Sequence, residues 1–154
     1  PDFLIGAGTV TRIDELERAA AAGASFAVAP GTNPVILQRA SEVGIPFFPG
    51  VCSPSDIELA LQHDRTFLKF FPAEAAGGLK MLSALHGPYA HRGVRFMPTG
   101  GVTLENLRDY LAHPSVVAIG GTWLAAKPLL EKRNWSAVEN LAREAVAIAE
   151  KVGH

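Results

Sequence analysis

Short apolar runs and longer amphipathic stretches alternate along the whole chain. Six apolar runs bounded by turn residues predict strands, at residues 3–5, 26–28, 46–48, 67–71, 94–97 and 116–119. Their first residues lie roughly 20–27 positions apart, which is about the length of one strand–helix unit with short loops. Because the runs are apolar on both faces, they are typical of parallel strands covered by helices.

The stretches between these runs carry signals for helix starts and stops. In the first stretch, Asp14 takes the capping-box position and Gly23 provides the stop. Two other stretches place a capping residue directly before a proline, which is favoured at the first helical position. The expected capping residues are Thr11, Asn33, Ser53, Thr103 and Ser136.

These units predict an α/β protein. No low-complexity linker separates them, so we expect a single domain over residues 1–154. Strand–helix–strand connections are right-handed, which allows an open sheet or a closed barrel. A TIM (β/α)8 barrel has eight units and needs at least about 200 residues, whereas this chain has 154. Either the sheet is open, or the chain supplies about six of the eight units of a barrel.

Composition excludes several classes of function. The formal net charge is −1, so there is no basic field to hold a nucleic acid. No apolar run approaches the roughly 18 residues that span a membrane, and the chain opens on a strand-like run instead of a signal peptide. The one cysteine, Cys52, cannot form an internal disulfide, which fits a cytoplasmic location.

The motifs also argue against a metal or a nucleotide cofactor. The histidines, at positions 63, 86, 91, 113 and 154, show no spacing typical of metal ligands. The segment Gly6-Ala7-Gly8-Thr9 lacks the third glycine of a dinucleotide-binding motif. We therefore expect a protein that works without a cofactor.

Lys69 is the strongest chemical signal in the chain. It lies inside an apolar run, and side-chain alternation puts it on the same strand face as Phe67 and Phe71. Burial there would lower the pKa of the lysine, and a neutral amine can condense with a ketone. Pro72 ends the strand soon afterwards, near the end where barrel enzymes carry their chemistry. The alternative is a lysine whose ammonium reaches solvent over its apolar stem, and this segment alone does not separate the two.

Two glycine turns follow the fifth and sixth expected strands, Thr99-Gly100-Gly101 and Gly120-Gly121-Thr122, and a short helix is expected at 123–126. Paired glycines let backbone N–H groups approach an anion, and barrels often bind phosphate with the loops after their last two strands. The alternative is ordinary tight turns. Combined with Lys69, a phosphate site implies a phosphorylated keto substrate.

Three further residues carry weaker signals. Thr9 follows the first strand and would face the mouth of an active site, or serve only as a turn residue. Pro30 is explained mostly by turn chemistry. For Glu74 we consider proton transfer, and favour a helix-start or solvated position instead.

Taken in order, these segments resemble the 2-keto-3-deoxy-6-phosphogluconate (KDPG) aldolases, also described as 4-hydroxy-2-oxoglutarate (KHG) aldolases. The resemblance covers essentially the whole chain, with family order and spacing. The matching segments are Gly6-Ala7-Gly8-Thr9-Val10, Ala29-Pro30-Gly31, Lys69-Phe70-Phe71-Pro72-Ala73-Glu74, Pro98-Thr99-Gly100-Gly101-Val102 and Gly120-Gly121-Thr122-Trp123.

The resemblance implies a cofactor-free aldehyde-lyase, a homotrimer of TIM barrels in the Entner–Doudoroff pathway. Such an enzyme reversibly cleaves KDPG to pyruvate and glyceraldehyde 3-phosphate, and the sequence leaves open whether 4-hydroxy-2-oxoglutarate is also cleaved. Lys69 falls on the Schiff-base lysine, which is the catalytic residue of the match.

The same resemblance implies roles for the substrate-binding residues. Thr9 falls on the threonine that helps to hold the pyruvate carboxylate, Pro30 and Phe71 line the pocket, and Thr99 lies where the aldehyde end is recognised. The residues that fall on the phosphate site are Gly100, Gly101, Gly121 and Thr122, the last in place of the usual serine.

The match also differs from the family at its front. The chain begins where the third strand of the family begins, so it corresponds to strands 3 to 8, and the catalytic glutamate and the carboxylate-binding arginine have no counterpart. We therefore expect a barrel that is incomplete at its N-terminus and turns over poorly, because general acid–base catalysis contributes about 10²–10⁴-fold.

Two other interpretations stay open at this point. One is a phosphate-binding barrel enzyme of another class, such as a sugar-phosphate isomerase, in which Lys69 acts only through its charge. The other is a non-catalytic fragment.

Overall fold

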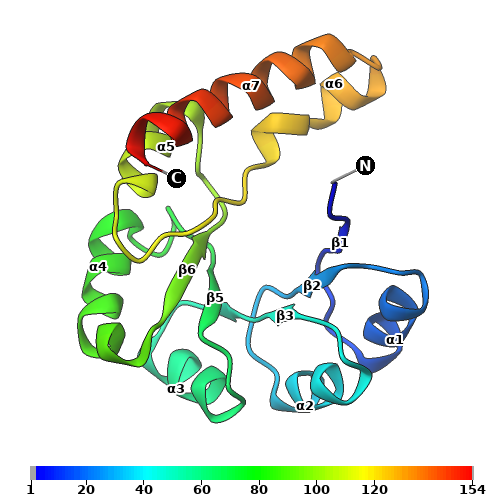
Figure 1. Cartoon of the computed structure of the whole chain (residues 1–154), viewed down its shortest axis with the longest axis vertical. Helices are drawn as coiled ribbons and strands as arrows, with labels where there is room; N and C mark the ends of the chain where they lie inside the picture. Colours follow the sequence, from blue (N-terminus) through cyan, green and yellow to red (C-terminus); the bar gives the residue numbers. More distant parts are fainter. Residues whose placement is uncertain (1–2, 154) are drawn as a thin grey trace.

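The computed structural model of the chain describes residues 3–153, whose strand–helix units follow one another along an arc (Figure 1). Helices α1 to α5 lie on the outer side of the arc and the strands on its inner side, while α6 and α7 extend past the last strand. The elements in chain order are β1 (Gly6–Ala7), α1 (Ile13–Ala21), β2 (Phe26–Val28), α2 (Pro34–Val43), β3 (Phe47–Phe48), β4 (Gly50–Val51), α3 (Pro54–Gln62), β5 (Phe67–Phe70), α4 (Gly78–Tyr89), the 3-10 helix η1 (Ala90–Arg92), β6 (Arg95–Pro98), α5 (Leu104–Leu111), the 3-10 helix η2 (Thr122–Ala125), α6 (Lys127–Glu131) and α7 (Trp135–Val152).

The strands form two parallel three-stranded sheets, in the order β1-β2-β3 and β4-β5-β6. Residues 47–51 connect them, because β3 pairs with β2 and β4 pairs with β5. Pro49 lies between β3 and β4, and its carbonyl accepts a hydrogen bond of 2.8 Å from the Lys69 N–H. A proline has no N–H to donate to a sheet, so the ladder is interrupted where the two sheets meet.

The prediction that the chain supplies six strand–helix units of a TIM barrel is contradicted by this topology. The described residues form two separate sheets, and the expected strand at 116–119 is absent from both. That segment makes only isolated parallel bridges, from Val116 to Phe96 and from Gly120 to Thr99. Its backbone N–H groups bond to β6 at Val117 and again at Gly120, with a break between them. Whether residues 1–154 form one domain stays a prediction.

The first expected strand is also displaced. Residues 3–5 precede β1, and Phe3, Leu4 and Ile5 are strongly exposed.

The prediction that helices cover both faces of the strands holds for one face only. Residues that point toward the helices are fully buried, whereas the opposite face carries a row of half-buried rings, Phe26, Phe48 and Phe67, whose neighbouring centroids are 5.7 and 4.5 Å apart.

Two hydrophobic clusters hold the helices on the sheets. The cluster behind β1-β2-β3 includes Leu16 of α1 and Leu37 of α2, both fully buried. The larger cluster behind β4-β5-β6 includes Phe70, Phe96 and Tyr110. The alternation along β5 is what divides its residues between the two faces, because successive side chains of a strand point in opposite directions.

The helix starts follow the expected chemistry except at α1 and α7. The side chains of Asn33 and Ser53 cap α2 and α3, as predicted. At α1 the N-cap is Arg12, one residue after the predicted Thr11. The carboxylate that accepts the free N–H groups there belongs to Glu15, and not to the predicted Asp14, because it reaches back to the N–H of Thr11 at 2.8 Å. At α7 the cap is Asn134, two residues before the predicted Ser136.

None of the helices between residues 3 and 153 has the length and apolar character to span a membrane.

We expect Gly50, which lies where the two sheets meet, to be important for the stability of the fold. A Cβ atom at this position would lie 2.1 Å from the Pro30 carbonyl oxygen, which is backbone and cannot swing away. Gly50→Ala should therefore lower the free energy of unfolding by about 1–3 kcal/mol, measured by urea titration. Gly87→Ala is the matched control, because a Cβ there meets nothing within 4 Å. Within helix α4 that change should be neutral or stabilise by about 0.5–1 kcal/mol. Equal stability of the two variants would contradict the prediction.

Candidate active site at the carboxyl ends of the strands

Lys69 occupies the third position of β5, the central strand of its sheet. Gly50 of β4 and Met97 of β6 are its register partners, so backbone pairing holds it on both sides. Leu68 and Phe70 are fully buried toward the helices, which turns the lysine side chain to the opposite face. The side chain stays largely out of water all the same, because the residue is only 9% exposed.

The surroundings of the Lys69 amine favour its neutral form. Burial lowers the pKa of this lysine below the ordinary value of 10.5. Within residues 3–153 no acidic side chain forms an ion pair with it. The ring of Phe71 lies under the amine, with Nζ 4.6 Å from the ring centroid, and this contact partly offsets the cost of burying an ammonium group. The alternative of a lysine that reaches freely into solvent does not describe this side chain.

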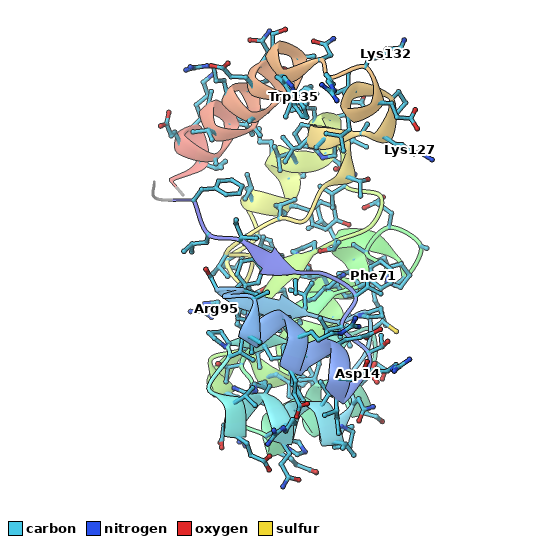
Figure 2. The ribbon with its side chains drawn as sticks, turned by 90° about the vertical axis from the view of Figure 1, so that its right-hand side faces the viewer. Asp14, Phe71, Arg95, Lys127, Lys132 and Trp135 are labelled. Carbon is cyan, nitrogen blue, oxygen red and sulfur yellow. The ribbon has the colours of Figure 1, made fainter. Side chains whose placement is uncertain are left out.

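The lysine end of β5 is the carboxyl end. Figure 2 shows Phe71, just beyond β5, and Arg95, at the start of β6, on opposite sides of the molecule. Parallel strands share their carboxyl ends, and α/β proteins bind ligands at that edge of the sheet. Lys69, Phe71 and the turn after β6 therefore lie together at the edge suited to a site.

The turn after β6 contains two consecutive left-handed residues, Gly100 with φ of +94° and Gly101 with φ of +82°. Only glycine adopts these angles without strain, and successive N–H groups in such a turn can face an anion. Two hydrogen bonds attach this turn to the segment after β5. The Ala73 N–H donates to the Thr99 carbonyl at 2.8 Å, and the Glu74 N–H donates to the Gly100 carbonyl at 3.0 Å.

The second glycine turn lies directly beside the first. The bridge from Thr99 to Gly120 places the two turns side by side. A Cβ at Gly120 would lie 2.3 Å from Oγ1 of Thr99, and a Cβ at Gly121 would lie 2.4 Å from Nε1 of Trp123. A side chain at either position would therefore have to displace Thr99 or Trp123. The short helix expected at 123–126 is the 3-10 helix η2, one residue earlier, and Thr122 is its first residue.

Thr9 and Pro30 come from the other sheet. Thr9 has φ of 58°, and a β-branched residue in the left-handed region is a strained outlier of the kind found at functional sites. The Pro30 carbonyl lies against Gly50, the register partner of Lys69, so Pro30 adjoins β4, the strand beside the lysine strand. No described contact joins Thr9 to Lys69, and its role stays a prediction.

One interaction at this edge was not predicted from the sequence. Glu74 is neither at a helix start nor simply solvated, because its carboxylate accepts a hydrogen bond from the hydroxyl of Tyr110. Tyr110 belongs to α5 and is 1% exposed. In the sequence it was indistinguishable from any core aromatic residue of an amphipathic helix, and only the approach of α5 to the segment after β5 pairs it with Glu74.

A parallel α/β fold that brings a buried lysine and two glycine turns to the carboxyl ends of its strands is the arrangement of an α/β enzyme. Comparison with known proteins agrees. The family model for KDPG and KHG aldolases matches residues 1–141. The 2-dehydro-3-deoxy-phosphogluconate aldolases of Haemophilus influenzae and Dickeya dadantii are 48% and 46% identical to this chain. The alignments cover 96% of the chain and 69% and 68% of those proteins.

Two solved structures are similar over the same share of the chain. The KDPG aldolase of Legionella pneumophila, with pyruvate captured as a covalent carbinolamine intermediate, has a TM-score of 0.87 at 38% identity, covering 96% of this chain and 69% of that one. The Zymomonas mobilis enzyme with 3-phosphoglycerate has a TM-score of 0.87 at 37% identity, covering 96% and 68%. The chain belongs to the KDPG and KHG aldolase family, and the prediction of an aldolase is confirmed.

The opposing effects of burial and of the Phe71 ring on the pKa of Lys69 can be tested by substitution. Phe71→Leu keeps an apolar side chain but removes the ring face that stabilises the ammonium group, so it should lower the pKa of Lys69 further. The pKa is measured by following the ¹³Cε resonance of the lysine as pH is raised. A wild-type pKa at or above 10.5 would contradict the burial argument. An unchanged value in the variant would contradict the role of the ring.

Proposed function

We propose that Lys69 is the amine with which this aldolase forms a Schiff base. The neutral amine attacks the ketone carbon of the substrate, and loss of water from the carbinolamine gives an iminium ion. The iminium accepts the electron pair of the carbon–carbon bond that breaks, while the hydroxyl of the departing fragment loses its proton and becomes an aldehyde. Reprotonation at carbon and hydrolysis then release pyruvate and restore the lysine.

The observation that carries this proposal is the environment of the lysine. A buried amine that no described carboxylate pairs with has a lowered pKa, and a larger share of it is neutral near pH 7. A surface lysine would be almost entirely protonated there, and a protonated amine is not a nucleophile. The covalent intermediate named for the Legionella pneumophila enzyme supports the same chemistry in a relative.

The substrate proposed is KDPG, which gives pyruvate and glyceraldehyde 3-phosphate, with 4-hydroxy-2-oxoglutarate as a second substrate. The phosphate would lie against Gly100, Gly101, Gly121 and Thr122, and the adjacent glycine turns support this because both end at the lysine edge. Thr99 would face the aldehyde end and Thr9 the pyruvate carboxylate, with Pro30 and Phe71 lining the space between. The strained backbone of Thr9 supports a functional role for that residue. A homotrimer and a cytoplasmic location are proposed from the family resemblance alone.

Lys69→Arg tests the amine directly. Arginine keeps the charge and most of the length but cannot form the imine, so incubation with pyruvate and borohydride should add a reduced pyruvate adduct to the wild type and none to the variant. Intact mass and peptide mapping measure the adduct. Lys80→Arg makes the same change at an exposed position of α4 and should label like the wild type.

The pH dependence of labelling gives a second check on the same residue. The initial rate should rise with pH through the lowered pKa of Lys69, because the neutral fraction of the amine rises there. Absence of an adduct in the wild type, or an adduct located on another lysine, would refute the proposal.

A further inference from the structure

Glu74 connects a buried tyrosine to the glycine turn after β6. Its carboxylate accepts a hydrogen bond from Tyr110, and its backbone N–H donates to the Gly100 carbonyl at 3.0 Å. Its side chain also packs on the next residue of the turn, since a Cβ at Gly101 would lie 2.5 Å from Cβ of Glu74. Glu74 therefore contacts two consecutive residues of the turn, and its carboxylate is fixed by the hydrogen bond from Tyr110.

Helix α5 closes this arrangement into a ring of contacts. The helix begins just after the turn, and Asn106 in its first turn donates to the Gly101 carbonyl at 3.3 Å and accepts from the Thr103 N–H at 2.8 Å. The same helix carries Tyr110 near its other end. The turn, α5, Tyr110 and Glu74 are thus joined to one another by hydrogen bonds.

The Tyr110 hydroxyl is suited to hold a carboxylate permanently. Burial, then the hydrogen bond and the charge of Glu74, raise the pKa of Tyr110 above its usual range, so the hydroxyl remains a donor at all ordinary pH values. Room for the pair is left by Gly78, where a Cβ would lie 3.2 Å from Oε1 of Glu74 and 3.5 Å from the Tyr110 hydroxyl.

The geometry points to Tyr110 and Glu74 as positioning residues for the phosphate end of the substrate: their hydrogen bond sets the Gly100–Gly101 turn in the shape that binds an anion. The inference rests on the proposed function only in taking that turn as the phosphate site. No described contact joins either residue to the Lys69 amine, and pyruvate carries no phosphate, so we expect pyruvate labelling of Lys69 not to depend on the pair.

Three substitutions separate the hydrogen bond from packing. Tyr110→Phe removes one hydroxyl and keeps the buried ring. Glu74→Ala removes the acceptor at an exposed residue, where loss of the side chain does not open the core. Glu74→Gln keeps an amide oxygen that still accepts from Tyr110, and it serves as the conservative rescue.

The probe is inorganic phosphate, titrated into the chain while the amide resonances of Gly100 and Gly101 are followed. Tyr110→Phe and Glu74→Ala should each raise the dissociation constant about tenfold, the size expected when a hydrogen bond to a charged group is lost. Glu74→Gln loses the same negative charge as Glu74→Ala but keeps the acceptor for Tyr110, so it should bind phosphate at least as tightly as the wild type, and the difference between the two variants isolates the hydrogen bond. Urea titration of each variant confirms that the fold is retained.

Labelling with pyruvate and borohydride separates this inference from the proposed function. All three variants should form the Lys69 adduct at the wild-type rate. Loss of labelling in the wild type would refute the Schiff-base proposal and leave the phosphate titration to decide the positioning role. Wild-type phosphate affinity in Tyr110→Phe and Glu74→Ala, or no response of the two glycine amides in the wild type, would overturn the inference.

Discussion

Backbone pairing of β5 on both sides is the constraint on which the candidate site depends. Gly50 and Met97 pair with Lys69 in register, and the Pro49 carbonyl accepts its N–H. Because the backbone is fixed in this way and successive side chains of a strand point to opposite faces, the Lys69 side chain must lie on the face opposite Leu68 and Phe70. The lysine is turned away from the helices by Leu68 and Phe70, which fill the core, and not by any contact of its own amine.

The electrostatics of the amine follow from that placement. Removing an ammonium ion from water costs several kcal/mol even after the protein relaxes. Contact of the ammonium group with an aromatic ring face offsets about 0.5–2 kcal/mol of this cost, more when the contact is shielded from water. The first effect is larger than the second, so the pKa of Lys69 is lowered despite the contact with Phe71. A carboxylate in the place of the ring would have reversed this balance and kept the amine protonated.

The glycines at this edge have different physical reasons for being glycine. Gly100 and Gly101 have left-handed backbones, which other residues adopt only with strain. Gly120 and Gly121 have ordinary backbones, and the side chains of Thr99 and Trp123 occupy the space that a Cβ would need. Both pairs appear in the sequence as Gly-Gly, although the first pair is required by the backbone of its turn and the second is crowded by neighbouring side chains.

Much of the local structure could be predicted from the sequence, and so could the burial of Lys69 within its strand, while the role of its amine stays a prediction. The apolar run around Lys69, the capped helix starts at Asn33 and Ser53 and the order of the glycine turns are local patterns, and the chemistry of each is contained in a few adjacent residues.

The number and pairing of the strands depend on contacts between residues that are distant in the sequence. Residues 116–119 are as apolar as a strand, yet whether they form one depends on hydrogen bonds to β6, which they make only in part. The pairing of Glu74 with Tyr110 likewise joins residues 36 positions apart, and it exists only because α5 returns to the segment after β5. Sequence determined which groups are available for chemistry, and tertiary structure decided which of them meet, because hydrogen bonds and packing between distant segments leave no mark in local periodicity.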